Sequence, residues 1–253
     1  MCPNRVPPRA TTTNPALAVW LAGVEARALF NPLAQSAADL ARWQELSSPR
    51  RLQEWEVSRA LLARALDYGA NAADFASADE RAVSLSHAAS HAAVAVSEAA
   101  ACVGVDLETV RERDFLRLSR FAFAEAEHAA LEALPPAERA ERFYILWTLK
   151  ESFTKALGQP LLATVRQCTF TEERGEWRAS VPTTSEWVAR VFRPRPQLVL
   201  SVVALLRHSP HPGNLSVSTH EWPGGNVSPW PTLATLASDA SVAWNSGAPL
   251  SNR

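Results

Sequence analysis

The sequence LWTLKESFTKALG (residues 146–158) holds the only two lysines of a 253-residue chain, Lys150 and Lys155. Every other residue of fixed positive charge is an arginine. Because a lysine ammonium is compact and a guanidinium is planar, the two lysines indicate positions where the compact cation matters. A proline pair at 135–136 precedes the stretch and Gly158 closes it, which predicts one long helix between them.

One face of this predicted helix carries side chains suited to a charged site. Trp147, Glu151 and Lys155 recur every four residues and therefore share that face, with Lys150 beside it. The alternative is an ordinary surface Glu–Lys pair worth roughly a few tenths of a kcal/mol. The tryptophan and the scarcity of lysine elsewhere favour a cation that neutralises phosphate charge.

An apolar strand upstream ends in two acids. The segment GVDLE (residues 104–108) places Asp106 and Glu108 on the same face, because side chains alternate along a strand. Two neighbouring carboxylates repel each other, and a divalent cation with oxygen ligands, such as Mg²⁺, would compensate their charge. The alternative is a solvated strand end that runs into the charged loop ETVRERD (residues 108–114).

Further candidates could bind phosphate. In SLSHAASH (residues 84–91), Ser86 and His87 offer a hydroxyl and an imidazole, although a purely structural histidine is the competing interpretation. They are not a nucleophile and its base, since neighbours on a strand point opposite ways and no nucleophile-elbow pattern surrounds them. Arg51 and Arg59 lie in a helical segment; arginine suits phosphate, and a solvated helix face is the alternative.

The bulk composition excludes several classes of protein. A formal net charge of -1 gives no strong field for nucleic acid or an acidic membrane, so neither partner is expected. An odd number of widely spaced cysteines forms neither a disulfide framework nor a zinc site, which predicts a cytoplasmic protein. The apolar run at 16–28 predicts a first buried strand at 17–21 rather than a secretory leader, and no stretch is long enough to span a bilayer.

Hydrophobic periodicity predicts a mixed order of elements along the chain. A helix is expected at 40–68, two strands around a turn within 79–97, and a third strand at 101–110. A helix at 117–134 adds Glu125 and Glu127, which either form a solvated face or enter the acidic cluster. Strand-like pieces between 167 and 206 predict a second, mostly antiparallel sheet.

Together these segments resemble the 4'-phosphopantetheinyl transferase superfamily, in particular the longer type that activates peptide and polyketide synthetases. The family pattern W-x-x-K-E-(S/A)-x-x-K-x-x-G is met without mismatch at 147–158, and G-(I/V)-D-(I/V/L)-E at 104–108. The pair at 86–87 matches a family serine–histidine element, and Phe123 with Glu127 fits a phenylalanine–glutamate spacing.

The resemblance covers roughly residues 15–206 and implies an α+β fold. Two similar α/β halves related by pseudo-twofold symmetry would bind coenzyme A in the cleft between them, in a monomer. The expected division is a disordered lead at 1–15, an N-terminal half at 16–106, a C-terminal half at 107–207, and a disordered, low-complexity tail at 208–253 that is not a family feature.

The resemblance also implies a reaction: transfer of the 4'-phosphopantetheine group from coenzyme A to a serine of an apo acyl or peptidyl carrier protein, releasing adenosine 3',5'-bisphosphate. Such an enzyme would serve secondary metabolite biosynthesis. Mg²⁺ would be held by Asp106, Glu108 and Glu151, with Glu151 also accepting the serine proton. Lys155 would contact phosphate and stabilise developing charge, with Lys150 as a supporting cation. The nucleotide would meet Ser86, His87, Arg51 and Arg59, with His87 on the 3'-phosphate.

Two departures from the family pattern leave other functions open. Ala88 stands where a second serine is usual, and no G-K-P element precedes the serine–histidine pair. Arg81 is the candidate to replace the lysine of that element. A non-catalytic coenzyme A or carrier-protein binding module is therefore a competing hypothesis. A Mg²⁺-dependent phosphohydrolase is another.

Overall fold

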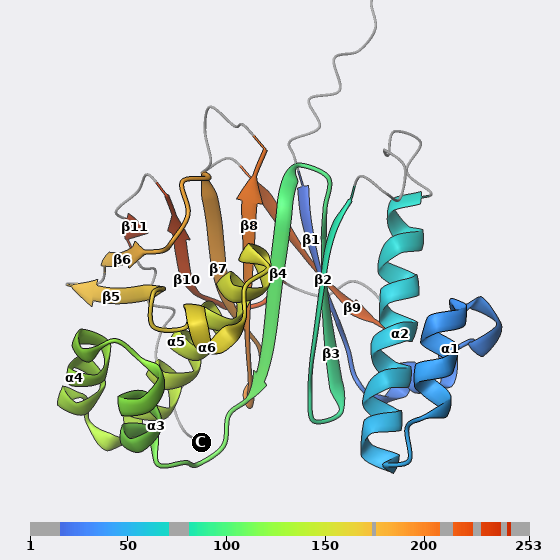
Figure 1. The fold of residues 1–253 in the computed structure, drawn as a ribbon, viewed down its shortest axis with the longest axis horizontal. Helices are drawn as coiled ribbons and strands as arrows, with labels where there is room; N and C mark the ends of the chain where they lie inside the picture. The colour runs from blue at the N-terminus through green and yellow to red at the C-terminus, as the bar shows by residue number, and fades with distance from the viewer. Residues whose placement is uncertain are drawn as a thin grey trace, which may run out of the picture.

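The structure is a computed structural model that describes residues 16–70, 81–173, 176–207, 215–224, 229–238 and 242–243. It is a mixed α/β fold with several sheets, as the sequence predicted (Figure 1). Two four-stranded sheets stand side by side, and each is covered by one long helix. Among the described residues, none of the helices is both long enough and apolar enough to cross a membrane.

The first sheet has the strand order β2-β3-β1-β9. Its strands are β1 (Ala16–Ala22), β2 (Ala82–Ala88), β3 (His91–Ser97) and β9 (Ser216–Trp222). The helix α2 (Pro49–Ala70) packs on β3, where Val57 and Leu61 meet Trp20 and Val94 in a buried cluster. The predicted first strand and the predicted pair of strands around a turn are both confirmed.

The second sheet has the order β10-β7-β8-β4 and is antiparallel where its register is recorded. Its strands are β4 (Ala100–Thr109), β7 (Trp187–Arg195), β8 (Leu198–Leu206) and β10 (Thr232–Ala237). The predicted long helix is α5 (Pro136–Leu157), which lies against β4 and β8. Leu149 and Phe153 of this helix are fully buried, so the helix is anchored in the core.

Smaller elements surround these two units. They are η1 (Val24–Leu29), η2 (Pro32–Ala34), α1 (Ala37–Gln44), α3 (Phe115–Ala122), α4 (Glu125–Ala133) and α6 (Leu161–Thr164). A small third sheet has the order β11-β6-β5, built from β5 (Thr169–Glu173), β6 (Glu176–Ser180) and β11 (Val242–Ala243). The predicted helix at 117–134 is thus two helices, which meet at Phe123 and Ala124.

The helix expected at 40–68 is also two helices. Ser36 caps the first, since its side chain accepts a hydrogen bond from the amide of Asp39. The second begins at Pro49, whose ring cannot continue a preceding helix but is tolerated in the first turn. The break arises from this proline and not from the hydrophobic periodicity on either side of it.

The two sheets meet edge to edge, where β2 of the first lies beside β4 of the second (Figure 1). Serine hydroxyls of β2 bridge this seam. The Ser84 Oγ accepts from the amide of Val105 at 3.0 Å, and the Ser86 Oγ accepts from the amide of Leu107 at 3.2 Å. Side chains of one sheet therefore satisfy backbone groups of the other at the seam.

Gly104 on β4 allows α5 to approach the sheet closely. A Cβ added at Gly104 would lie 1.9 Å from the carbonyl oxygen of Ser152 and 2.8 Å from the amide nitrogen of Ala156. The helix ends at Gly158, whose φ of 63° is in the left-handed region that glycine adopts without steric cost.

The expectation of disorder after residue 208 is wrong for the described parts of that segment. Strand β9 pairs in parallel with β1, and β10 pairs antiparallel with β7, so the chain adds one edge strand to each large sheet. Most of the prolines, glycines and serines of this segment lie outside these two strands in the sequence. Short edge strands gain their hydrogen bonds from a neighbour distant in sequence, which composition does not reveal. The predicted lead at 1–15 lies outside the described residues.

Candidate functional site

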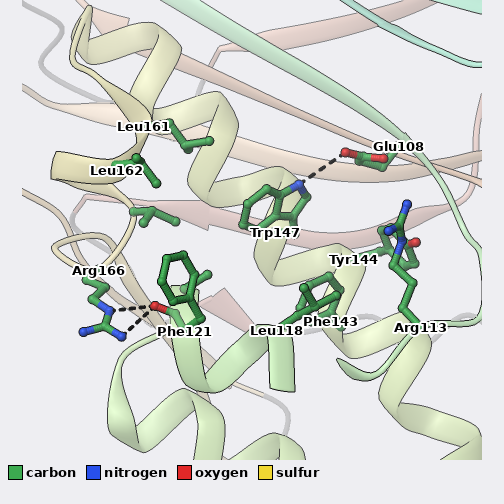
Figure 2. A pocket seen from close by; sticks show the side chains of 12 residues that line it. Glu108, Arg113, Leu118, Phe121, Phe143, Tyr144, Trp147, Leu161, Leu162 and Arg166 are labelled. Atoms are coloured by element: carbon green, nitrogen blue, oxygen red, sulfur yellow. Dashed lines mark hydrogen bonds between the residues drawn. The ribbon is translucent and has the colours of Figure 1, made fainter. Parts of the chain in front are cut away.

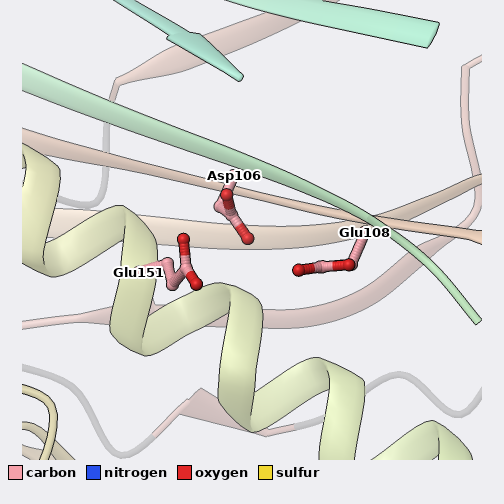
Figure 3. Close-up of side chains that lie close together, drawn as sticks. All are labelled: Asp106, Glu108 and Glu151. Carbon is pink, nitrogen blue, oxygen red and sulfur yellow. The ribbon is translucent and has the colours of Figure 1, made fainter. Parts of the chain in front are cut away.

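Three carboxylates converge between β4 and α5. Asp106 and Glu108 come from β4, and Glu151 faces them from α5 (Figure 3). One ligand oxygen of each lies within 4.8 Å of the others. The structure thus brings together the three acids for which the sequence predicted a shared cation.

The two oxygens of Asp106 have different surroundings. Its Oδ1 accepts hydrogen bonds from the Ser86 hydroxyl at 2.9 Å and from the Lys155 ammonium at 2.7 Å. The same ammonium donates to the carbonyl of Val105 at 2.9 Å. The Oδ2 is buried and has no hydrogen-bond partner among the described residues. An unpaired buried carboxylate oxygen is costly, so it calls for a positive partner.

The other two acids have raised pKa values. Burial, and secondly the charge of Asp106, raise the pKa of Glu108, and a hydrogen bond from Trp147 opposes that rise. The Trp147 Nε1 donates to Glu108 at 3.2 Å (Figure 2). Burial and then Asp106 raise the pKa of Glu151 to about 8, against the opposing effect of Lys155. The single positive charge of Lys155 therefore does not offset the negative charge of the three carboxylates.

This donor set fits a hard divalent cation. All three groups offer oxygen, the ligand that Mg²⁺ prefers in proteins, and their oxygens are close enough to share one ion. The unpartnered Oδ2 of Asp106 and the raised pKa values of its neighbours are both relieved by a bound cation.

The expectation that Lys150 supports this cluster is wrong. Its side chain is fully buried, and its Nζ lies 2.8 Å from Oε2 of Glu127, which is equally buried. The ammonium also donates to the carbonyls of Val165, at 2.9 Å, and Cys168. One residue along a helix turns the side chain by about 100°, so the neighbour of Glu151 points into the core. Glu127 pairs with Lys150 and does not enter the acidic cluster.

Ser86 and His87 point away from each other. Ser86 is buried beside Asp106, whereas the His87 side chain is half exposed and its Nδ1 lies 3.8 Å from Oε2 of Glu54 on α2. Adjacent strand residues face opposite sides, so the structure does not bring this pair together around one point.

The arginines on α2 have different environments. Arg51 is exposed, whereas Arg59 forms an ion pair with Asp39 at 2.9 Å and stacks over the ring of Trp55 at 4.1 Å. Arg81, the substitute for the missing lysine element, donates from Nη1 to the carbonyl of Leu66 at 2.9 Å. Arg81 therefore helps to hold the end of α2 in this structure.

Sequence reasoning missed a pocket that adjoins the acidic cluster. It has a volume of about 670 Å³ and lies among α3, α5 and α6 (Figure 2). Its lining is mostly apolar: Glu108, Arg113, Leu118, Phe121, Ala122, Phe143, Tyr144, Trp147, Leu161, Leu162, Val165 and Arg166. Because Glu108 belongs to both, and Trp147 of the pocket donates a hydrogen bond to it, the pocket opens beside the carboxylates.

Exposed apolar side chains mark the rim of this pocket. Phe121 is 73% exposed and Leu162 is 79% exposed, although both are large and hydrophobic. Arg166 links the two sides, since its guanidinium donates to the carbonyl of Phe121 (Figure 2). Phe143 and Trp147 lie four residues apart on α5, and their rings stack with centroids 6.1 Å apart. This aromatic spacing was the signal in the sequence that could have indicated the pocket.

Comparison with known proteins places this site within a matched region. Residues 102–199 match the family model of the 4'-phosphopantetheinyl transferase superfamily, a segment that contains the three acids and Lys155 but not Ser86. The 4'-phosphopantetheinyl transferases AcpT of Escherichia coli O157:H7 and of strain K12 are each 34% identical over 125 residues. That alignment covers 46% of this chain and 63% of AcpT, so the chain spans less than two thirds of these relatives.

A Synechocystis protein, slr0495, whose name gives the same transferase, is 38% identical over 66 residues, which is 26% of this chain and 27% of that protein. The segment that the family model matches carries the acidic cluster, and the names of these relatives all contain the words 4'-phosphopantetheinyl transferase. The chain is therefore similar to the 4'-phosphopantetheinyl transferase superfamily over part of its length, including the segment that carries the three acids.

Proposed function

We propose that this protein transfers the 4'-phosphopantetheine group of coenzyme A to a serine of an apo acyl or peptidyl carrier protein, with adenosine 3',5'-bisphosphate as the second product. The family match supports a transferase. The observation that carries the proposal is the convergence of Asp106, Glu108 and Glu151, with Lys155 bonded to the first of them.

Asp106, Glu108 and Glu151 would hold Mg²⁺. A divalent cation in this position neutralises pyrophosphate oxygens and so makes the phosphoanhydride a better electrophile. The protein supplies the rest of the chemistry. Glu151, whose carboxylate lies beside those of Asp106 and Glu108, is proposed to accept the proton of the acceptor serine, directly or through a water.

Lys155 would stabilise charge at the phosphate as the phosphoanhydride breaks. Its side chain is 32% exposed although the ammonium bonds Asp106 and the carbonyl of Val105, so part of the side chain remains accessible. A lysine acts there as a point charge beside the leaving group.

The nucleotide is proposed to lie on the α2 side of the seam. His87 is half exposed next to the first turns of α2 and is proposed to contact the 3'-phosphate. Arg51 is exposed on the same helix, whereas Arg59 would have to share its charge with Asp39. Ser86 would also belong to this set by resemblance, but its hydroxyl already bonds Asp106.

The apolar pocket beside Glu108 is the proposed approach for the pantetheine arm and the acceptor serine. Its wall of Phe143, Trp147 and Leu161 offers an uncharged surface, and Arg113 and Arg166 border it. An apolar wall beside a charged cluster excludes water from one side of the reacting phosphate. The exclusion of water strengthens the electrostatic interactions there.

The finer assignments are also proposals. They are the synthetase-activating branch and its role in secondary metabolite biosynthesis, a cytoplasmic monomer, and two halves at 16–106 and 107–207 related by pseudo-twofold symmetry. The packing of one 22-residue helix against each large sheet supports two similar halves. Strand β4 (Ala100–Thr109) belongs wholly to the second sheet and spans the proposed boundary.

The test is to incubate the protein with coenzyme A, Mg²⁺ and a panel of apo carrier proteins, and to weigh the carriers by intact-protein mass spectrometry. We expect one phosphopantetheine group on a carrier and an equal amount of adenosine 3',5'-bisphosphate. A carrier with its acceptor serine replaced by alanine is the control. Nucleotide release without any carrier would indicate a phosphohydrolase, and coenzyme A binding without release would indicate a binding module.

A further inference from the structure

The proton of the Ser86 hydroxyl is used within the protein. It donates its single proton to Oδ1 of Asp106 at 2.9 Å and accepts the amide of Leu107 at 3.2 Å. The residue is only 7% exposed. A hydroxyl has one proton to give, so Ser86 cannot donate to a ligand phosphate without releasing the carboxylate.

Asp106 is correspondingly asymmetric. Two donors, the Ser86 hydroxyl and the Lys155 ammonium, meet on Oδ1, while Oδ2 is buried and receives none. A carboxylate held at one oxygen by two donors cannot rotate freely about its Cβ–Cγ bond. Its other oxygen therefore keeps one direction, on the side where Glu108 and Glu151 bring their own oxygens.

We propose that Ser86 is a positioning residue for the metal centre, which holds Oδ1 of Asp106 so that Oδ2 is presented to the cation. The inference rests on the metal site of the proposed function and replaces, for Ser86, the role of a phosphate ligand. Outer partners that orient a metal ligand commonly affect metal affinity by about 10- to 100-fold.

The same strand provides a matched control. Ser84 lies two residues earlier on β2, on the same face, and its Oγ accepts the amide of Val105 at 3.0 Å. Ser84 and Ser86 thus make equivalent bonds across the seam, but the recorded bond to a carboxylate is that of Ser86. Replacing either one removes a seam hydrogen bond, whereas replacing Ser86 also frees Asp106.

The experiment measures binding of Mg²⁺, and of Mn²⁺ as a second probe, to EDTA-stripped full-length protein by isothermal titration calorimetry, without coenzyme A. We expect Ser86→Ala to raise the Kd by about 10-fold or more. Ser84→Ala should keep the Kd within about twofold of the parent protein. Ser84→Ala lacks one hydrogen bond and should lower the Tm by about 2–4 °C. Ser86→Ala lacks two hydrogen bonds and should lower the Tm by more than Ser84→Ala does.

A second pair of variants covers the case in which Ser86→Ala does not fold. Thr and Val are nearly isosteric, so Ser86→Thr and Ser86→Val add the same bulk and differ in the hydroxyl. The Kd of Ser86→Thr for Mg²⁺ should be lower than that of Ser86→Val by about 10-fold, the factor expected between the parent protein and Ser86→Ala.

Binding of adenosine 3',5'-bisphosphate in EDTA separates the two roles of Ser86. A positioning role leaves this metal-free affinity unchanged in Ser86→Ala. Parent-like Mg²⁺ affinity together with weakened nucleotide affinity would overturn the inference and make Ser86 a phosphate ligand. If the parent protein binds neither cation, the inference fails together with the metal site. A parent that binds the cation but transfers nothing to any carrier refutes the proposed function alone.

Discussion

The close contact between β4 and α5 predicts a large effect of one methyl group. In Gly104→Ala the new Cβ would lie 1.9 Å from the carbonyl oxygen of Ser152 and 2.9 Å from its carbonyl carbon. Non-bonded contacts of Cβ atoms in proteins essentially never fall below 3.0 Å. The atoms it meets are helix backbone, which cannot move aside as a flexible side chain can. The helix or the strand must therefore shift by about 1 Å or more.

That shift would separate the groups of the site, because Glu151 and Lys155 are on α5 while Asp106 is on β4. Overpacking of this kind costs about 1–3 kcal/mol, and more where backbone must move. A misplacement of about 1 Å can reduce turnover by about 100-fold. We expect Gly104→Ala to lower the Tm by several degrees and transfer to a carrier by about 100-fold, measured by scanning fluorimetry and by mass spectrometry.

Gly158→Ala is the matched control. A Cβ at Gly158 meets nothing within 4 Å, so its cost arises from the left-handed φ of 63°, about 1 kcal/mol or slightly more. It should lower stability while it leaves turnover near the parent value below the unfolding transition. Parent-like stability and turnover in Gly104→Ala would refute the contact on which the prediction rests.

Four further predictions concern the charged residues. Glu151→Gln should abolish transfer while circular dichroism stays unchanged, and near-normal turnover would exclude its role as base and ligand. Lys155→Arg keeps the charge but not the compact shape, so transfer should still fall; equal activity would make the scarcity of lysine a matter of composition only. A pKa of about 8 for Glu151, raised from 4.5, stabilises the protonated native state, and this contribution is lost as pH rises through 8. Added Mg²⁺ should therefore raise the Tm more at pH 8 than at pH 6, and an equal shift at both would contradict the site. Lys150→Met leaves Glu127 charged and without its ion-pair partner in the core. The free energy of unfolding, measured with urea, should therefore fall by about 3–5 kcal/mol. A fall below about 1 kcal/mol would show that the pair is not buried as described.

Much of the acidic cluster could be predicted from local periodicity. Alternation on a strand places Asp106 and Glu108 on one face, and the four-residue spacing places Glu151 and Lys155 on one side of a helix. The ends of that helix followed from a proline pair and Gly158. Each of these relations is set within about ten residues of chain, where backbone geometry alone decides which way side chains point.

Relations that depend on distant segments could not be predicted in this way. Lys150 is one residue from Glu151, yet its direction was decided by Glu127 and the carbonyls of Val165 and Cys168, which pack on the far side of the helix. The edge strands β9 and β10 likewise depended on their partner strands, β1 and β7.

The sequence by itself therefore determined which residues could form the charged site, since the two motifs carry Asp106, Glu108, Glu151 and Lys155 at spacings that only one face of each element can satisfy. Only the tertiary structure decided which groups surround them: the apolar pocket beside Glu108, the removal of Lys150 into the core, and the Ser86 hydroxyl on Asp106. The physical reason is that local spacing selects the face of a helix or strand, whereas long-range packing selects what that face meets.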